Sequence, residues 1–224
     1  MLFPLKDRKT IAEGTTEITL SIPLELRDTF VWKPGQHIDA VLPVPRYTDE
    51  RGASRLFSLS STPQNKESIT FAFRNSGSAW KRHVLEMELG GPIDVTGPFG
   101  FFTLPKKIEK PLVFIAGGIG IVPFMSMVRH TRETDLAHQI TLLYANNSPE
   151  HAAYEPELKT YLGNSLISHY GPLSKEILTN TPRQENTRFY IAGPVGMVAL
   201  AVKALEESGI PSLSILTEEF TGYN

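Results

Sequence analysis

The chain has 224 residues, a formal net charge of −2 and no cysteine. This length suits one large domain or two small ones, with a core that needs no covalent cross-links. Without cysteine the chain has no disulfide, no Cys-ligated iron–sulfur or zinc site and no thiol nucleophile. The charge gives no general attraction to nucleic acid or to anionic membranes. The six histidines lack a zinc-binding spacing, so we expect no metal and no nucleic-acid partner.

The sequence also argues against export and membrane insertion. Charged side chains begin at Lys6, and the N-terminal region has no apolar run of signal-peptide length. No stretch reaches the ~20 apolar residues that a membrane-spanning helix needs. We therefore expect a soluble protein of a reducing compartment, the cytoplasm.

The first half of the chain, residues 1–107, has the hydrophobic period of antiparallel strands. Apolar and polar side chains alternate, which is typical of strands with one buried face. Short strands at regular spacing, separated by turns rich in glycine and proline, predict a small barrel or sandwich. The strands are expected at residues 16–22, 36–42, 56–59, 69–73 and 93–96, with one helix at 78–89.

The second half, residues 108–224, instead alternates helices with short strands that are apolar throughout. Such strands predict a parallel sheet covered by helices on both faces. The strands are expected at residues 112–116, 140–145, 166–169, 189–192 and 213–216, and the helices at 123–134, 153–162, 175–178 and 196–208. The pattern changes at residues 105–107, which we interpret as a short linker between two domains.

A glycine-rich loop follows the first of these apolar strands. The loop contains Gly117, Gly118 and Gly120, and Pro123 stands where a helix begins. Glycines let backbone N–H groups approach a pyrophosphate, which then lies at the positive end of the helix. A tight structural turn explains the glycines equally well in isolation, but the first strand–helix crevice of a parallel sheet is where nucleotides bind. The third glycine and the acid of the usual dinucleotide fingerprint are absent, so a different sub-type of loop is expected.

Two further segments carry candidate binding residues. In the sequence RLFS, alternation sends Arg55 and Phe57 to one face of a strand, where a guanidinium suits a diphosphate and an aromatic ring suits a flat ring system. A surface arginine on a barrel strand is the plain alternative. Residues 76–78 precede the helix of the first half and predict either an anion site or simple N-capping. Lys81 and Arg82 are expected on the solvated face of that helix.

The order RLFS, R-NSGSAWK, GPFGFF, AGGIGIVPF, AGPVGM and EEFTGY resembles the ferredoxin–NADP reductase superfamily. More narrowly, it is similar to short stand-alone FAD-dependent NAD(P)H oxidoreductase modules. The resemblance implies a six-stranded antiparallel flavin-binding barrel over residues 1–107. It further implies a five-stranded parallel, Rossmann-like nucleotide-binding domain over residues 108–224.

The resemblance implies roles for individual residues of the barrel. Arg55 matches the arginine on the flavin diphosphate, Phe57 the aromatic on the flavin ring and Ser58 the serine near flavin N5. The flavin-side set also includes Leu56, Phe73, Ser76, Gly77, Ser78 and Ala79, the last four receiving the flavin phosphates. Trp80 or Lys81 stands where relatives often have a further serine, and FAD is expected rather than FMN.

On the nucleotide side, the resemblance assigns Gly117, Gly118, Gly120, Pro123, Asn146, Gly193, Pro194 and Met197 to NAD(P) binding. Ala192 stands at the position of a cysteine that relatives place near the nicotinamide. No positive charge follows the second parallel strand at residues 146–148, so NADH is favoured over NADPH. Near the C-terminus, Glu218 and Phe220 match an acid and an aromatic beside the flavin, and a disordered tail is the alternative.

These expectations define a flavin-dependent oxidoreductase that passes hydride from NADH or NADPH to bound FAD, and electrons to a separate acceptor. The acceptor classes left open are ferredoxin, flavodoxin, a haem protein, another redox partner or a quinone. Ser58, Glu218 and Phe220 are the predicted catalytic residues.

A nucleotide- and flavin-binding electron-transfer or regulatory subunit, inactive without a partner, is the alternative, and Ala192 favours it. An α/β hydrolase is disfavoured because the chain lacks GxSxG and a Walker lysine. His37, His83 and His130 are expected at ordinary surface or half-buried positions, and Trp32 and Trp80 in packing.

Overall fold

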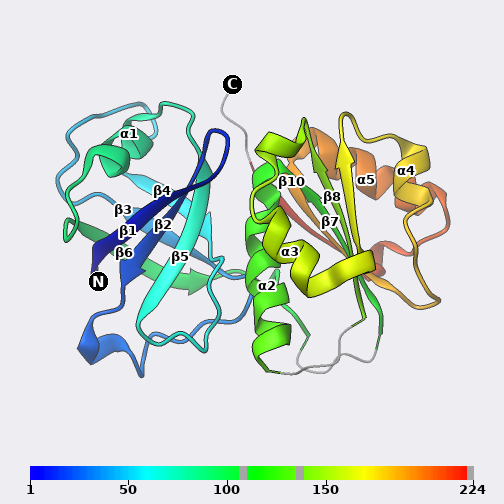
Figure 1. Cartoon of the computed structure of the whole chain (residues 1–224), viewed down its shortest axis with the longest axis horizontal. Coiled ribbons are helices and arrows are strands. Elements are labelled where there is room, and N and C mark those ends of the chain that lie inside the picture. The colour runs from blue at the N-terminus through cyan, green and yellow to red at the C-terminus, as the bar shows by residue number, and fades with distance from the viewer. Residues whose placement is uncertain (106–109, 135–138, 221–224) are drawn as a thin grey trace.

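The computed structural model describes residues 1–105, 110–134 and 139–220, in which two sheets form the centres of two halves (Figure 1). One sheet is six-stranded and antiparallel and the other is five-stranded and parallel, so the predicted fold class is confirmed. The domain boundary and linker predicted at residues 105–108 lie almost wholly outside the described residues. No helix in the described ranges is long and apolar enough to cross a membrane.

The antiparallel sheet has the strand order β4-β3-β6-β1-β2-β5. A bridge between Leu59 and Phe71 joins its two edge strands, so the sheet closes into a barrel. The inward-facing side chains of the alternating pattern form one core, into which Trp80 of helix α1 inserts and donates its indole N–H to the Ala40 carbonyl at 3.0 Å. The elements are β1 (Leu2–Ala12), β2 (Thr15–Ser21), β3 (His37–Val41), β4 (Ser54–Ser58), β5 (Ser68–Arg74), α1 (Ala79–Glu86) and β6 (Pro92–Phe99).

Strand β1 is the one barrel element that the hydrophobic period did not predict. Only Phe3 and Leu5 of this strand are buried, while the charged run from Lys6 to Lys9 lies toward solvent. Two inward apolar residues make an alternating run that is too short to identify as a strand from the sequence. Pairing with β2 and β6, rather than its own pattern, holds β1 in the sheet.

The parallel sheet has the order β11-β10-β7-β8-β9, with helices on both faces (Figure 1). All six residues of β7 are buried, as expected for a central parallel strand. Phe114 and Tyr190 pack beneath α2 on one face, and Ile115 and Phe189 pack near α5 on the other. The elements are β7 (Leu112–Gly117), α2 (Ile121–Glu133), β8 (Ile140–Asn146), α3 (Glu155–Leu162), β9 (Leu166–Tyr170), α4 (Lys175–Thr179), β10 (Arg188–Pro194), α5 (Val195–Glu207) and β11 (Ile215–Phe220).

The last strand differs from its predicted position at residues 213–216. Residues 212–214 form a single 3-10 turn, in which Leu213 is 96% exposed. The strand itself runs from Ile215 to Phe220 beside β10. The described part of the C-terminal segment is therefore ordered sheet, and it carries Glu218 and Phe220 to the end of the parallel sheet.

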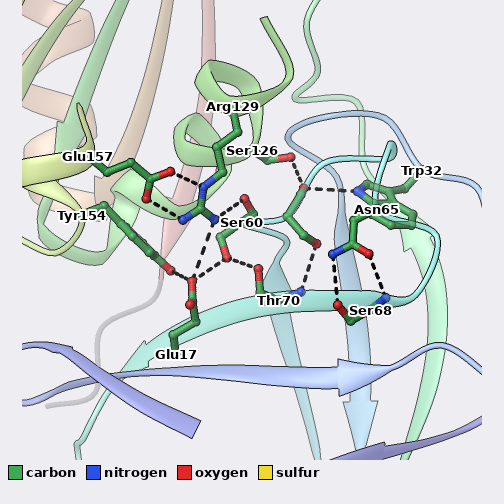
Figure 2. A network of polar contacts seen from close by, with 11 residues as sticks. Glu17, Trp32, Ser60, Asn65, Ser68, Thr70, Ser126, Arg129, Tyr154 and Glu157 are labelled. Atoms are coloured by element: carbon green, nitrogen blue, oxygen red, sulfur yellow. Dashed lines mark hydrogen bonds and ion pairs between the residues drawn. The ribbon is translucent and has the colours of Figure 1, made fainter. Parts of the chain in front are cut away.

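A polar network joins the two halves along α2 (Figure 2). The Arg129 guanidinium donates to the Ser60 carbonyl at 3.0 Å and to both carboxylate oxygens of Glu157 at 2.8 Å. Glu17 of the barrel accepts a 2.5 Å hydrogen bond from Tyr154 and lies 4.0 Å from Arg129. A network with these partners fixes one relative orientation of the halves, because a shift would leave half-buried charges without partners.

Candidate functional site

A cavity of about 1030 Å³ lies between the two sheets and is lined by residues of both. Most of the predicted site residues line it: Arg55, Leu56, Phe57, Ser58, Phe73 and Ser76 of the barrel half, and Gly117, Gly118, Asn146, Pro194, Met197, Glu218 and Phe220 of the other. Gly77, Ser78, Ala79, Gly120, Pro123 and Gly193 are not among its lining residues. The cavity thus brings together predicted site residues that are up to 165 positions apart in the sequence, from Arg55 to Phe220.

Strand β4 presents its residues to the cavity as its pleat dictates. Arg55 and Phe57 share one face, as alternation predicts, and that face is the inner one. The Phe57 ring stacks on Phe71 with centroids 4.6 Å apart and is only 7% exposed. Leu56, on the opposite face, is 64% exposed and adds an apolar surface to the cavity wall.

The buried Arg55 guanidinium has partners within the loop that precedes β4. One terminal nitrogen, Nη1, donates to the carbonyl oxygens of Arg51, Gly52 and Ser54. The other, Nη2, lies 2.8 and 2.9 Å from the two carboxylate oxygens of Asp49. The Nε atom is buried and has no hydrogen-bond partner among the described residues.

Positive charge collects at the barrel end of the cavity, where Arg51, Arg74 and Lys81 also line the wall. The prediction that Lys81 lies on a solvated face is wrong: it is 3% exposed, and its ammonium donates to the Arg74 carbonyl at 2.7 Å and to Ser76 at 3.1 Å. Burial, followed by the charges of Arg55 and Arg51, lowers the pKa of Lys81 to about 8. Neighbouring cations of this kind form a site for an anionic group, which would relieve their mutual repulsion.

At the centre of the cavity, Ser58 of the barrel donates to Glu218 of β11 at 3.3 Å. Burial raises the pKa of Glu218 to about 7, so its carboxyl gains and loses a proton near neutral pH. His37 Nδ1 lies 3.8 Å from the other oxygen of Glu218, and burial lowers the pKa of His37. Because the lowered pKa favours a neutral His37 near pH 7, we interpret the contact as a neutral imidazole beside a carboxyl that is about half protonated, rather than as an ion pair.

Sequence reasoning placed His37 at an ordinary half-buried position. It is half-buried, but it also lies on the cavity wall next to a predicted catalytic pair. The signal that leads to it is strand register: His37 pairs with Ser58 across β3 and β4, so the two residues stand side by side at the same end of the barrel.

The glycine loops act through close backbone approach. A Cβ on Gly120 would lie 2.2 Å from the Ala192 carbonyl oxygen, and one on Gly117 would lie 2.2 Å from the Met197 sulfur. Gly118 has a φ of +52°, a conformation that few side chains tolerate. The loops after β7 and β10 therefore touch, and only glycine permits this. Gly120 lies behind the cavity wall and supports it.

Arg74 is a cavity residue that the predicted set omitted. It ends β5 and donates to the His151 carbonyl at 3.3 Å, across to the other half of the molecule. A Cβ on Gly118 would lie 3.2 Å from its Nη2, so the guanidinium lies directly over the glycine loop. A cation in this position faces any diphosphate that the loop receives.

Buried polar atoms without partners show that the cavity is suited to a polar ligand on both sides. Arg55 Nε is one of these on the barrel side, and both side-chain polar atoms of Asn146 are others on the nucleotide side. Such atoms carry an unrelieved cost of burial unless a ligand or water satisfies them. With its cationic end, apolar wall and glycine loops, the cavity fits a flavin dinucleotide against the barrel and a nicotinamide nucleotide against the parallel sheet. In the described ranges, no group of three His, Asp or Glu side chains is placed to hold a metal ion.

The comparisons with known proteins agree with this geometry. Residues 114–170 match the family model described as the oxidoreductase NAD-binding domain. The chain is 27% identical to the reductase component of propane 2-monooxygenase from Rhodococcus jostii, covering 97% of this chain and 65% of that one. It thus spans about two thirds of that relative, and about half of the flavohemoproteins that it also matches.

Two solved structures share the whole fold. The FAD/NAD-binding domain of nitric oxide dioxygenase from Vibrio cholerae superposes with a TM-score of 0.84 at 20% identity, covering 99% of this chain and 98% of that one. Ferredoxin-NADP+ reductase from Plasmodium falciparum superposes with a TM-score of 0.74 at 19% identity, covering 98% and 95%. The arrangement of the two sheets is therefore a known two-domain fold.

Proposed function

We propose that this chain, a member of the ferredoxin–NADP reductase superfamily, binds FAD and NAD(P)H in its inter-sheet cavity and passes electrons to a separate acceptor. The observation that carries the proposal is the continuity of the cavity, which joins the cationic barrel end to the glycine loops of the parallel sheet. A flavin and a nicotinamide must lie side by side in one space for hydride to pass between them, and this cavity is a continuous space of that kind.

The residues around the cavity divide the binding between them. Arg55, Ser76 and Lys81 would hold the phosphate end of FAD, and Leu56 would contact its apolar surface. The loop at residues 117–120, with Arg74 above it, would receive the diphosphate of the nicotinamide nucleotide. When bound, FAD supplies the redox chemistry, since it accepts hydride and releases electrons to an acceptor.

Protons at the centre of the cavity are handled by Ser58 and Glu218. A carboxyl group with a pKa of about 7 holds a proton at Oε2 or Oε1 in half of the molecules at neutral pH. The Ser58 hydroxyl, which donates to this carboxyl, orients it toward the barrel wall. His37 lies on the other side of the carboxyl and limits the directions from which water can reach it.

NADH is the donor that we propose over NADPH. At the ends of β8 and β9 the cavity is lined by Asn146, Asn147, His151, Gly171 and Leu173, none of which is a Lys or Arg. The Arg74 guanidinium reaches the His151 carbonyl from β5, and we assign it to the diphosphate. A 2′-phosphate is usually bound by a positive charge at this edge of the sheet. Amide side chains there suit the hydroxyl groups of an unphosphorylated ribose.

A redox protein is the proposed acceptor. The relatives include a monooxygenase reductase component, which by its printed name serves an oxygenase. The cytoplasm is the proposed location, since the nicotinamide nucleotide that the cavity is suited to bind is supplied there. The alternative, a subunit that is inactive alone, is favoured by Ala192, which is fully buried and brings no reactive group to the cavity.

The test is the visible spectrum of the purified full-length chain, chromatography of the released flavin, and anaerobic titration with NADH. We expect the bands of oxidised flavin, FAD as the released species, and bleaching by NADH at lower concentration than by NADPH. A chain that binds FAD but is not bleached by either nucleotide favours the inactive-subunit alternative. A chain that binds no added flavin contradicts the proposal.

A further inference from the structure

A carboxylate, Asp49, is bound to Arg55, the residue that the proposed function assigns to the phosphate end of FAD. Asp49 lies in the loop between β3 and β4 and is bound by donors from three directions. Arg55 Nη2 contacts both of its oxygens at 2.8 and 2.9 Å, the Ala79 N–H donates to Oδ2 at 3.0 Å and the Arg51 N–H donates to Oδ1 at 3.0 Å. An arginine together with a backbone N–H at a helix start is the donor set that binds phosphate groups.

The shape of the cavity agrees with this occupation. Its wall includes Ser76 and Lys81 but not Gly77, Ser78 or Ala79, so the residues at the very start of α1 do not line it. Ser78 Oγ is buried there, makes no cap bond to the helix and has no partner among the described residues. The Ala79 N–H is therefore not free at the start of α1, because Asp49 accepts its hydrogen bond.

Surface contacts hold the Asp49 loop against α1. Tyr47 donates to Glu86 at 2.5 Å, the Arg46 N–H donates to His83 Nδ1 at 2.7 Å, and the Arg82 guanidinium lies 4.2 Å from the centre of the Tyr47 ring. These contacts are exposed and individually weak. They place Asp49 on Arg55 without preventing the loop from moving away.

We infer that Asp49 competes with the phosphate groups of FAD for Arg55 and the start of α1, and so sets the affinity of this site for phosphorylated flavins. The inference rests on the proposed function. A bound diphosphate and the Asp49 carboxylate cannot share Arg55 Nη2 and the Ala79 N–H, so FAD must displace the carboxylate. Riboflavin carries no phosphate and has no need to displace it. In the wild-type chain, the affinity for FAD should therefore exceed the affinity for riboflavin by a smaller factor than the positive charges of the cavity alone would give.

The test compares FAD and riboflavin binding to the flavin-free full-length chain by fluorescence titration. Asp49→Ala removes the competing carboxylate, and Asp49→Asn keeps its size while removing its charge. Because charge-assisted hydrogen bonds contribute on the order of 1.5–3 kcal/mol, we expect the FAD affinity to rise about tenfold or more in Asp49→Ala and by less in Asp49→Asn. Riboflavin affinity should stay within about twofold of wild type.

Glu50→Gln is the matched control, because Glu50 is the neighbouring exposed acid of the same loop. It removes one negative charge without touching Arg55 and should leave the ratio of FAD to riboflavin affinity unchanged. A fall in FAD affinity in both Asp49 variants, with thermal unfolding temperatures near wild type, would overturn the inference and make Asp49 a structural cap of α1. An equal rise for both flavins, or no change, also overturns it. Absence of flavin binding in all four proteins contradicts the proposed function itself.

Discussion

The two halves of the molecule form their shares of the cavity by different means. In the barrel half, side chains form the polar part of the cavity wall: Arg55 and Lys81 contribute charge, and Ser58 contributes a hydroxyl group. In the parallel half, Gly117 and Gly118 present backbone. Binding by the barrel half should therefore be weakened by substitutions that remove a charged or polar side-chain group. Binding by the parallel half should be weakened by substitutions that add side-chain atoms to a glycine. The following variants test this distinction, beginning with the largest expected effect.

Glu218 is an exception to this contrast between side chains in the barrel half and backbone in the parallel half, since it belongs to the parallel sheet but acts through its side chain. Its folded pKa of about 7 exceeds its usual 4.5, so the folded chain holds a proton that the unfolded chain has released. The free energy of unfolding therefore falls as pH rises from about 4.5 to about 7, by at most roughly 3 kcal/mol. Glu218→Gln should lose this part of the pH dependence and gain stability at pH 8 relative to wild type.

Urea unfolding of both proteins at pH 4.5 and pH 8 measures this difference. Glu219→Gln is the control, since Glu219 is the adjacent residue of β11 and its side chain is exposed. Parallel pH profiles for Glu218→Gln and wild type would contradict the assignment of a raised pKa to Glu218.

Gly120→Ala tests the backbone share. The added Cβ would lie 2.2 Å from the Ala192 carbonyl oxygen, so the two glycine loops must separate. Overpacking of this kind costs about 1–3 kcal/mol, and we expect weaker NADH binding as well. In Gly196→Ala the new Cβ meets nothing within 4 Å and lies in helix α5, so the chain should gain about 0.5–1 kcal/mol. Equal effects of the two substitutions on the free energy of unfolding in urea would contradict a close backbone contact at Gly120.

Arg74→Ala asks whether a barrel side chain serves the nucleotide side. We expect the Kd for NADH to rise about tenfold, because a charge-assisted bond contributes on the order of 1.5 kcal/mol. The free energy of unfolding should change little, since only its 3.3 Å bond to the His151 carbonyl is lost. Arg82→Ala, on the exposed side of α1, is the control and should leave the Kd unchanged. Unchanged NADH binding in Arg74→Ala would confine the nucleotide site to the parallel half.

Ser78→Ala has the smallest expected effect on stability. The hydroxyl is buried, has no hydrogen-bond partner in the described ranges and makes no cap bond, so its loss should change the free energy of unfolding by less than about 0.5 kcal/mol. Ser174→Ala is the comparison, because Ser174 does cap α4 through the Ile177 N–H and its loss should cost about 1 kcal/mol. A cost at Ser78 as large as that at Ser174 would show that it serves the fold rather than a ligand.

Hydrophobic period was sufficient to predict both sheets, because their central strands have strong and different patterns. It failed at β1, which is held in the sheet by pairing with its neighbours although few of its residues are apolar and buried. It also misplaced the start of β11, because the exposed Leu213 was counted as a strand residue. The positions of the glycine loops followed from sequence order, since the ends of neighbouring parallel strands share one edge.

The contacts of individual side chains were harder to predict. Nothing in the spacing of Asp49 and Arg55 indicates that the loop between them turns its carboxylate onto the guanidinium. Lys81 is buried because α1 is short and packs its first turn against Phe73, which helical periodicity over eight residues cannot reveal. The environments of these residues depend on loops, whose conformations are set by tertiary contacts.

The network along α2 has a consequence for recombination between relatives. Two of its cross-domain bonds, from Arg129 and Ser126, end on the main-chain carbonyls of Ser60 and Ser61, which any residue would supply. Glu17 contributes a barrel carboxylate to the contacts with Arg129 and Tyr154. Thr62 and Arg74 are further barrel side chains that bond across, to Glu133 and to the His151 carbonyl. A barrel from a divergent relative, grafted onto this parallel half, should therefore dock in the same orientation if it keeps the carboxylate at position 17, the hydroxyl at position 62 and the arginine at position 74.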